Sequence, residues 1–86
     1  MPVTVNERRG NGAVIGVAGA LASASAADFE ALISELIGEG ARVIIADMTD
    51  APYVSSAGIG SLLLSHKKVS SLGGRFYLYG ANSEIV

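Results

Sequence analysis

Several residue types that support common protein functions are absent or scarce in this 86-residue chain. It has no cysteine, which excludes a disulfide framework and a thiolate metal site. Its single histidine cannot form a zinc site alone. Six Lys and Arg against eight Asp and Glu give a net charge of -2, so no basic face is expected to bind nucleic acid. We therefore expect neither a metal nor another cofactor.

Long apolar runs are also missing. None approaches the roughly 18–20 residues that cross a bilayer, so no membrane span is predicted. Glu7, Arg8 and Arg9 stand where the apolar core of a signal peptide would lie. The expected location is therefore the cytoplasm.

What is present is apolar: half of the residues are hydrophobic and 16% are charged. Such a chain can bury a core, and its length fits one domain over residues 1–86. A domain of this size buries only about 60–65% of the surface that its unfolded chain exposes. It is therefore expected to lean on a partner, and a homodimer is left open.

The first part of the chain predicts a β-hairpin. Val3 to Val5 indicates a strand, Gly10 to Gly12 a tight turn, and Ala13 to Ala18 a second strand. Strands joined by so short a turn must be antiparallel.

A helix is predicted next, with Ser25 as its N-cap and Asp28 three residues further on. Its apolar residues recur with helical period, and Gly38 and Gly40 end it. This stripe comprises Phe29, Leu32, Ile33, Leu36 and Ile37.

The remaining elements alternate between strand and helix, which predicts parallel pairing with helical crossovers. In order they are a strand over 42–46, a polar loop over 47–53, a helix from about Ala57 to Leu72, a strand over 76–79, and a further helix beginning at Asn82 or Ser83. The predicted fold is α/β, with a mixed, mostly parallel four-stranded sheet in the order β-β-α-β-α-β, packed with helices.

The most informative segment runs from Asp47 to Gly60, from strand through loop to helix start. Ser55 or Ser56 is the expected N-cap, and capping is the ordinary role of a serine there. The free N–H groups and the helix dipole at this end also favour an anion, so a phosphate on Ser56 would suit the site. Gly58 and Gly60 lack side chains, which would let a partner approach closely.

A helical projection assigns two faces to the second helix. The predicted buried face comprises Ile59, Leu62, Leu63, His66 and Val69, and the opposite face comprises Ala57, Gly60, Ser61, Leu64 and Lys68. We interpret the second face as a docking face with Leu64 as its apolar anchor. His66 is expected to be a core or interface residue. It lies about 15 Å along the helix from Ser56, too far for a Ser–His catalytic pair.

Asp47 and Asp50 place two carboxylates in one loop. They would serve as metal ligands or as an acid and a base, although capping and turn formation is the favoured interpretation. A hydrolase that uses Ser56 with either aspartate is a further alternative.

Taken together, these motifs resemble the STAS domains of the anti-sigma factor antagonist family. Their hallmark is Asp-Ser-Ser/Thr-Gly-Leu/Ile-Gly after a strand and loop, then a helix ending in Gly-Gly and another strand. The resemblance covers nearly the whole chain. The matching residues are Gly19-Ala20-Leu21, Ala46-Asp47-Met48, Ser55-Ser56-Ala57-Gly58-Ile59-Gly60, Leu62, Leu63, Leu72, Gly73 and Gly74.

The resemblance implies a STAS-type fold with a truncated C-terminal helix, and a binding module in place of an enzyme. It implies that Ser56 is phosphorylated by an anti-sigma factor that is also a serine kinase. A metal-dependent serine phosphatase would reverse the modification, and the unphosphorylated form would bind the kinase and free a sigma factor. The predicted partner-binding residues are Leu21, Ser55, Ser56, Ala57, Gly58, Gly60, Ser61 and Leu64.

Three positions depart from the family pattern. Ser55 replaces the acidic residue that normally precedes the acceptor, and Ala20 and Ala22 replace two acids in the loop after the second strand. These changes keep a second hypothesis open: a non-phosphorylated STAS scaffold or a transporter-associated subunit.

Overall fold

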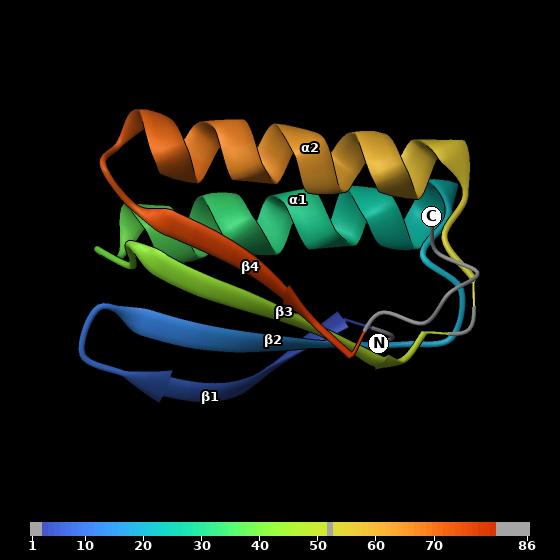
Figure 1. Ribbon diagram of the computed structural model, residues 1–86, viewed down its shortest axis with the longest axis horizontal. Helices are drawn as coiled ribbons and strands as arrows, with labels where there is room; N and C mark the ends of the chain where they lie inside the picture. Colours follow the sequence, from blue (N-terminus) through green and yellow to red (C-terminus); the bar gives the residue numbers. More distant parts are fainter. Residues whose placement is uncertain (1–2, 52, 81–86) are drawn as a thin grey trace.

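The computed structural model describes residues 3–51 and 53–80, which form a two-layer α/β domain (Figure 1). Two helices lie side by side over one face of a four-stranded sheet, whose strand order is β1-β2-β3-β4. The predicted order of elements is confirmed. The elements are β1 (Val3–Arg9), β2 (Gly12–Ala18), α1 (Ser23–Gly38), β3 (Val43–Asp50), α2 (Ser56–Ser71) and β4 (Arg75–Tyr79).

The sheet is mixed, as predicted. β1 and β2 are antiparallel, with Val3 opposite Val17, and the register shifts between Val5 and Glu7. β2 and β3 are parallel, as are β3 and β4. The carboxyl ends of β2, β3 and β4 therefore meet at the end of the sheet where α2 begins.

Some boundaries differ from the sequence-based expectation. β3 extends to Asp50 because Asp47 and Asp50 pair with Gly16 and Ala18 of β2, so most of the predicted polar loop is strand. The prediction of Ser25 as N-cap was wrong. The predicted helix after Asn82 lies outside the described residues.

The first helix instead has Ala22 at its N-cap position, and Ser25 lies within its first turn. The Ser25 hydroxyl accepts a hydrogen bond from the Ala22 N–H at 2.9 Å and donates one to the Ala20 carbonyl at 2.9 Å. Ser25 thus stabilises the helix start from inside. A sequence pattern cannot distinguish this role from that of a cap, since both place a serine near the first turn.

The core lies between the sheet and the helices. Strand residues alternate between the two faces, so Ala13, Ile15 and Val17 of β2 point toward the helices and are buried. They pack with buried residues from every layer, among them Leu21, Phe29, Ile33, Ile44, Met48, Leu62 and Val69.

The predicted buried face of α2 was wrong in phase. The structure buries Gly58, Ser61, Leu62, Ser65 and Val69, whereas Ile59, Leu63 and His66 are exposed. The Ser61 hydroxyl donates to the Ala26 carbonyl of α1 at 3.0 Å. Small side chains face α1 because the two helices approach closely there, and a projection weighted by hydrophobicity cannot detect this.

His66 is accordingly a surface residue. Its ring packs edge-on against Phe76 of β4, with centroids 6.4 Å apart. This contact places the His66 side of α2 above β4.

Two glycines of α2 give a matched test of this packing. A β-carbon at Gly58 would overlap the Leu21 carbonyl oxygen, whereas one at Gly60 would meet nothing within 4 Å. Gly58→Ala should lower the free energy of unfolding by about 1–3 kcal/mol through overpacking. Gly60→Ala should raise it by about 0.5–1 kcal/mol, because alanine favours helix. Urea denaturation followed by circular dichroism measures both, and changes of equal sign would contradict the packing.

Candidate functional site

The connection before α2 is tied by its backbone to the connection before α1. The Leu21 N–H donates to the Tyr53 carbonyl and the Ser55 N–H donates to the Leu21 carbonyl, both at 2.9 Å. Leu21 and Val54 accordingly form an isolated parallel bridge. The Gly19 N–H donates to the Asp50 carbonyl at 2.9 Å. These bonds hold the start of α2 in place against the sheet.

Ser55 is the N-cap of α2. Its backbone is extended, with φ -77° and ψ 174°, and its hydroxyl oxygen accepts from the Gly58 N–H at 3.2 Å. The same hydroxyl lies 3.3 Å from the Leu21 carbonyl and can donate to it. Of the two serines that the sequence offered as caps, Ser55 therefore has this role.

Ser56 is the first residue of α2 and is exposed. Among the described residues, its side chain makes no hydrogen bond. The N–H groups of the first helical turn and the positive end of the helix dipole surround it, which favours negative charge at this place. Its hydroxyl can thus be reached from solvent, and a phosphate ester on it would lie in a favourable field.

Three of the predicted partner-binding residues do not lie on an accessible surface. Leu21 is 0% exposed, Ser61 is 1% exposed, and Gly58 is buried against Leu21 and Val54. Their predicted contact with a partner requires exposure that this structure does not provide. The lack of a side chain at Gly58 is accounted for by close packing inside the domain, against Leu21 and Val54.

The other predicted contact residues form a strip on the surface. Ala57 follows Ser56 and is exposed, Gly60 is half-buried, and Leu64 is 55% exposed. Leu64 lies about 12 Å along the helix axis from Ser56, on the flank of α2 that faces α1, beside Glu30. We refer to Ser55, Ser56, Ala57, Gly60 and Leu64 as the Ser56 strip.

One residue beside this strip was missed from the sequence. Tyr53 is 57% exposed and lies three residues before Ser56, in the tied connection. A lone aromatic residue in a loop has no periodicity to reveal it. The usable signal would have been its nearness in sequence to the two serines.

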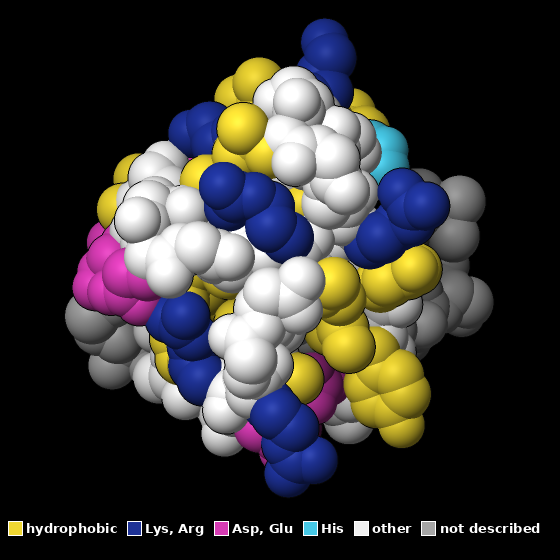
Figure 2. Space-filling model, turned by 90° about the vertical axis from the view of Figure 1, so that its left-hand side faces the viewer, with side chains coloured by type: hydrophobic (Ala, Val, Ile, Leu, Met, Phe, Trp, Pro, Cys, Tyr) yellow, Lys and Arg dark blue, Asp and Glu magenta, His cyan; other side chains and the backbone are white. Residues whose placement is uncertain are grey.

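The charged residues are distributed unevenly between the ends of the molecule. Basic side chains gather at the end where the β1–β2 hairpin turns and α2 finishes (Figure 2). Arg8 forms an ion pair with Glu39 there, and Arg42 donates to the Ile37 carbonyl at 3.1 Å. Asp47 and Asp50 lie toward the opposite end, where α2 begins. A phosphate on Ser56 would therefore add negative charge at the end of the molecule that holds Asp47 and Asp50.

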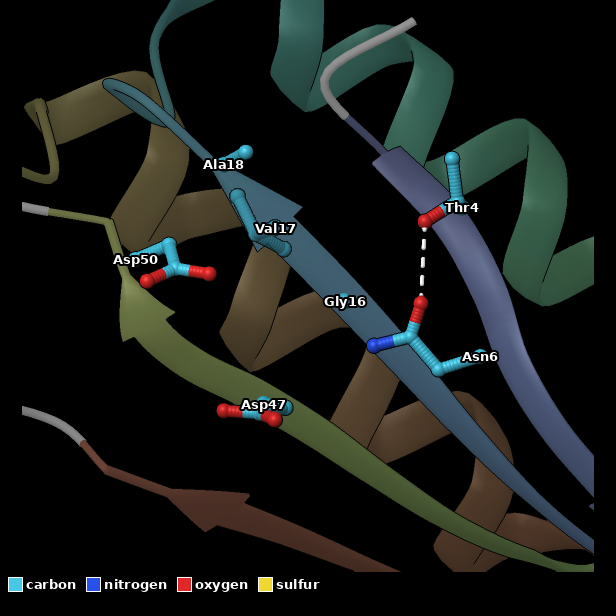
Figure 3. A pocket seen from close by; sticks show the side chains of 7 residues that line it. All are labelled: Thr4, Asn6, Gly16, Val17, Ala18, Asp47 and Asp50. Carbon is cyan, nitrogen blue, oxygen red and sulfur yellow. Dashed lines mark hydrogen bonds between the residues drawn. The ribbon is translucent and has the colours of Figure 1, made fainter.

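Asp47 and Asp50 line a small hollow on the outer face of the sheet, about 120 Å³ in volume (Figure 3). The Thr49 hydroxyl and N–H donate to Asp47 at 2.5 and 3.0 Å, and these bonds lower the pKa of that carboxyl. These bonds are local, since they join residues two apart in β3, at the irregularity in its pairing with β2. The described residues include no group of three His, Cys, Asp or Glu side chains that could hold a metal ion.

A hydrolytic site at Ser56 finds no support in this geometry. Ser56 does not line the hollow that contains the two aspartates. His66 lies on the same continuous helix, about 15 Å along its axis from Ser56.

Over residues 3–51 and 53–80, no helix is long and apolar enough to cross a membrane.

Solved structures similar to this chain include anti-sigma factor antagonists. Unphosphorylated SpoIIAA matches with a TM-score of 0.82 and 23% identity, over 93% of this chain and 74% of the other. Phosphorylated SpoIIAA from Bacillus matches with a TM-score of 0.81 and 23% identity, over 94% of this chain and 74% of the other. A STAS-domain antagonist from Rhodobacter sphaeroides matches with a TM-score of 0.72 and 22% identity, over 98% of this chain and 94% of the other. These likenesses show the fold.

The same fold also occurs as part of a longer protein. The Mglu structure matches with a TM-score of 0.79 and 14% identity, over 93% of this chain but only 20% of the Mglu chain. No curated protein sequence matches this chain significantly. The family model described as the STAS domain matches residues 3–86. The chain therefore belongs to the STAS domain family.

Proposed function

We propose that this chain is an anti-sigma factor antagonist, a protein-binding module switched by phosphorylation of Ser56. In its unmodified form it binds an anti-sigma factor with serine kinase activity and so frees a sigma factor. A metal-dependent serine phosphatase restores this form, and the exchange takes place in the cytoplasm. The observation that supports this proposal best is the division of roles between two serines: Ser55 caps α2, while the Ser56 hydroxyl faces solvent.

A phosphate at this place would act through charge. It adds a charge of about -1.5 to -2 at neutral pH beside the exposed Ala57, at one end of the Ser56 strip. A partner that buries this strip would have to desolvate the phosphate, which is costly without a matching cation. The modified form is therefore expected to bind weakly.

The fold need not change for the switch to operate. The phosphorylated and unphosphorylated forms of SpoIIAA match this chain about equally, with TM-scores of 0.81 and 0.82. The helix dipole also favours an anion at the first residue of α2. Both observations support a switch that alters the surface and leaves the domain intact.

A second candidate is a constitutive scaffold or transporter-associated subunit that is never phosphorylated. It is favoured by the neutral residues Ala20, Ala22 and Ser55 and by the occurrence of this fold within the longer Mglu chain. Mass spectrometry of the protein from its own cells separates the two. A permanent complex in which Ser56 never carries phosphate favours the scaffold.

Incubation with the cognate serine kinase and ATP should place one phosphate on Ser56, located by mass spectrometry of the peptides. Ser56→Ala should abolish the modification. The matched variant Ser55→Ala should retain it while losing about 1 kcal/mol of stability, because it removes the N-cap. Stoichiometric phosphate elsewhere, with Ser56 unmodified, would defeat the assignment.

Substitution Ser56→Asp should weaken binding to the anti-sigma factor by about tenfold or more, measured by isothermal titration calorimetry. Stability should not fall, because an acidic residue at a helix start is favourable by about 0.3–1 kcal/mol.

Ser23→Asp is the matched control, because Ser23 is the exposed first residue of α1. It introduces the same charge at the same kind of helix position and should leave affinity unchanged. Equal affinity of Ser56→Asp and wild type for the anti-sigma factor would count against the switch. If both variants weakened binding equally, the weakening would be a general effect of charge and would not support a switch at Ser56.

A further inference from the structure

The turn between β1 and β2 places an asparagine directly before a glycine. β1 ends at Arg9 and β2 begins at Gly12, so the turn itself consists of Gly10 and Asn11. Gly10 has a φ of 59°, as the first residue of a type II′ hairpin turn requires. In Figure 1 this turn lies at the end of the molecule opposite the start of α2, and thus far from Ser56.

An asparagine in this position can cyclise with the backbone of the residue that follows it. A base removes the proton from the Gly12 backbone nitrogen, which attacks the side-chain carbonyl carbon of Asn11. The side-chain nitrogen leaves as ammonia, taking up a proton from water, and a succinimide ring is formed. Water then opens the ring at one of its two carbonyls and gives aspartate or isoaspartate. A side chain on the second residue would hinder the attack, and glycine has none.

The start of β3 favours the first step of this reaction. When the Gly12 nitrogen loses its proton, peptide resonance shares the negative charge with the Asn11 carbonyl oxygen. That oxygen accepts hydrogen bonds from two backbone N–H groups, Arg42 at 2.8 Å and Val43 at 3.0 Å. Donors that are already aimed at the atom where charge develops stabilise the charged state. The fold therefore activates the peptide bond that has to react.

Both reacting groups can be reached from solvent. Asn11 is exposed, and within the part of the chain that the structure describes its side chain makes no hydrogen bond. Gly12 lines a shallow hollow of about 140 Å³ on the outer face of the sheet, where a base and water can enter. The charged residues of this hollow, Glu7 and Arg9, are of opposite sign, so no net negative charge repels hydroxide.

Asn6, in the same hairpin, lacks these features and serves as an internal comparison. Its amide oxygen accepts a hydrogen bond from the Thr4 hydroxyl at 3.1 Å. Its side chain lies over Gly16, where a β-carbon would overlap it. It is followed by Glu7, whose side chain hinders attack by the backbone nitrogen. The two asparagines of the hairpin are therefore expected to differ in reactivity.

We propose that Asn11 is a modification site, which converts to aspartate or isoaspartate in the folded protein with water as its co-reactant. The new carboxylate takes the net charge of the chain from -2 to -3. It appears at the end of the molecule where basic side chains gather (Figure 2). Isoaspartate also adds a carbon to the main chain of the turn, which displaces the carbonyl that β3 binds. The reaction does not depend on phosphorylation of Ser56.

Incubation of the folded protein at mildly alkaline pH tests the site. Ion exchange should resolve a more acidic form that accumulates with release of ammonia, and mass spectrometry of its peptides should place the change at Asn11, with Asn6 intact. Gly12→Ala should slow the conversion several-fold, because a methyl group hinders the attack. Gly60→Ala is the matched control: it adds the same methyl group where nothing lies within 4 Å, and should leave the rate unchanged.

Urea concentrations below the unfolding transition show which state reacts. Conversion in the folded state keeps its rate as urea rises, whereas a rate that follows the unfolded fraction overturns the proposal. An Asn11 that stays intact in the folded protein, while a peptide of residues 7–16 converts, also overturns it. So does conversion of Gly12→Ala at the wild-type rate, since the backbone nitrogen would then not be the attacking group.

Discussion

The position of Leu21 between two stretches of backbone is the constraint on which the candidate site depends. Its N–H and carbonyl are both bonded to the segment that leads into α2, and its side chain is fully buried. The Leu21 carbonyl also sets how closely α2 can approach, since only a glycine at position 58 leaves room for it. The direction of the helix start, and with it the exposure of Ser56, follows from these contacts. Leu21 supports the site from beneath and does not belong to its surface.

The same constraint accounts for the two adjacent serines. A cap must have a short side chain with an oxygen that can accept from the first turn, and both serine and aspartate satisfy this requirement. Serine at position 55 therefore retains the capping bond to Gly58 while removing the negative charge that the family pattern has before the acceptor. The replacement changes what a partner would encounter at the helix start without changing how the helix begins. It bears on partner choice more than on folding.

Much of the fold followed from the sequence, because periodicity reports directly on it. The apolar stripe of α1 predicted its buried face, and the element order and mixed sheet are confirmed. The buried face of α2 could not be predicted from the sequence. Close contact with α1 selects small residues such as Ser61, which a hydrophobic projection assigns to solvent. The buried position of Leu21 was missed for a related reason. Its burial arises from pairing with Tyr53 and Ser55, more than thirty residues away.

The unusual composition of α2 is explained by the number of surfaces that the helix has to present. A helix that covers one face of a sheet needs a single apolar stripe, yet α2 exposes leucines on two flanks of a buried face made largely of small residues. Leu64 lies on the flank that faces α1, whereas Leu63 lies seven residues after Ser56 and so shares its side of the helix. Exposed apolar side chains on a small domain favour association. A partner that extends along α2 from Ser56 can therefore meet both leucines on one exposed surface.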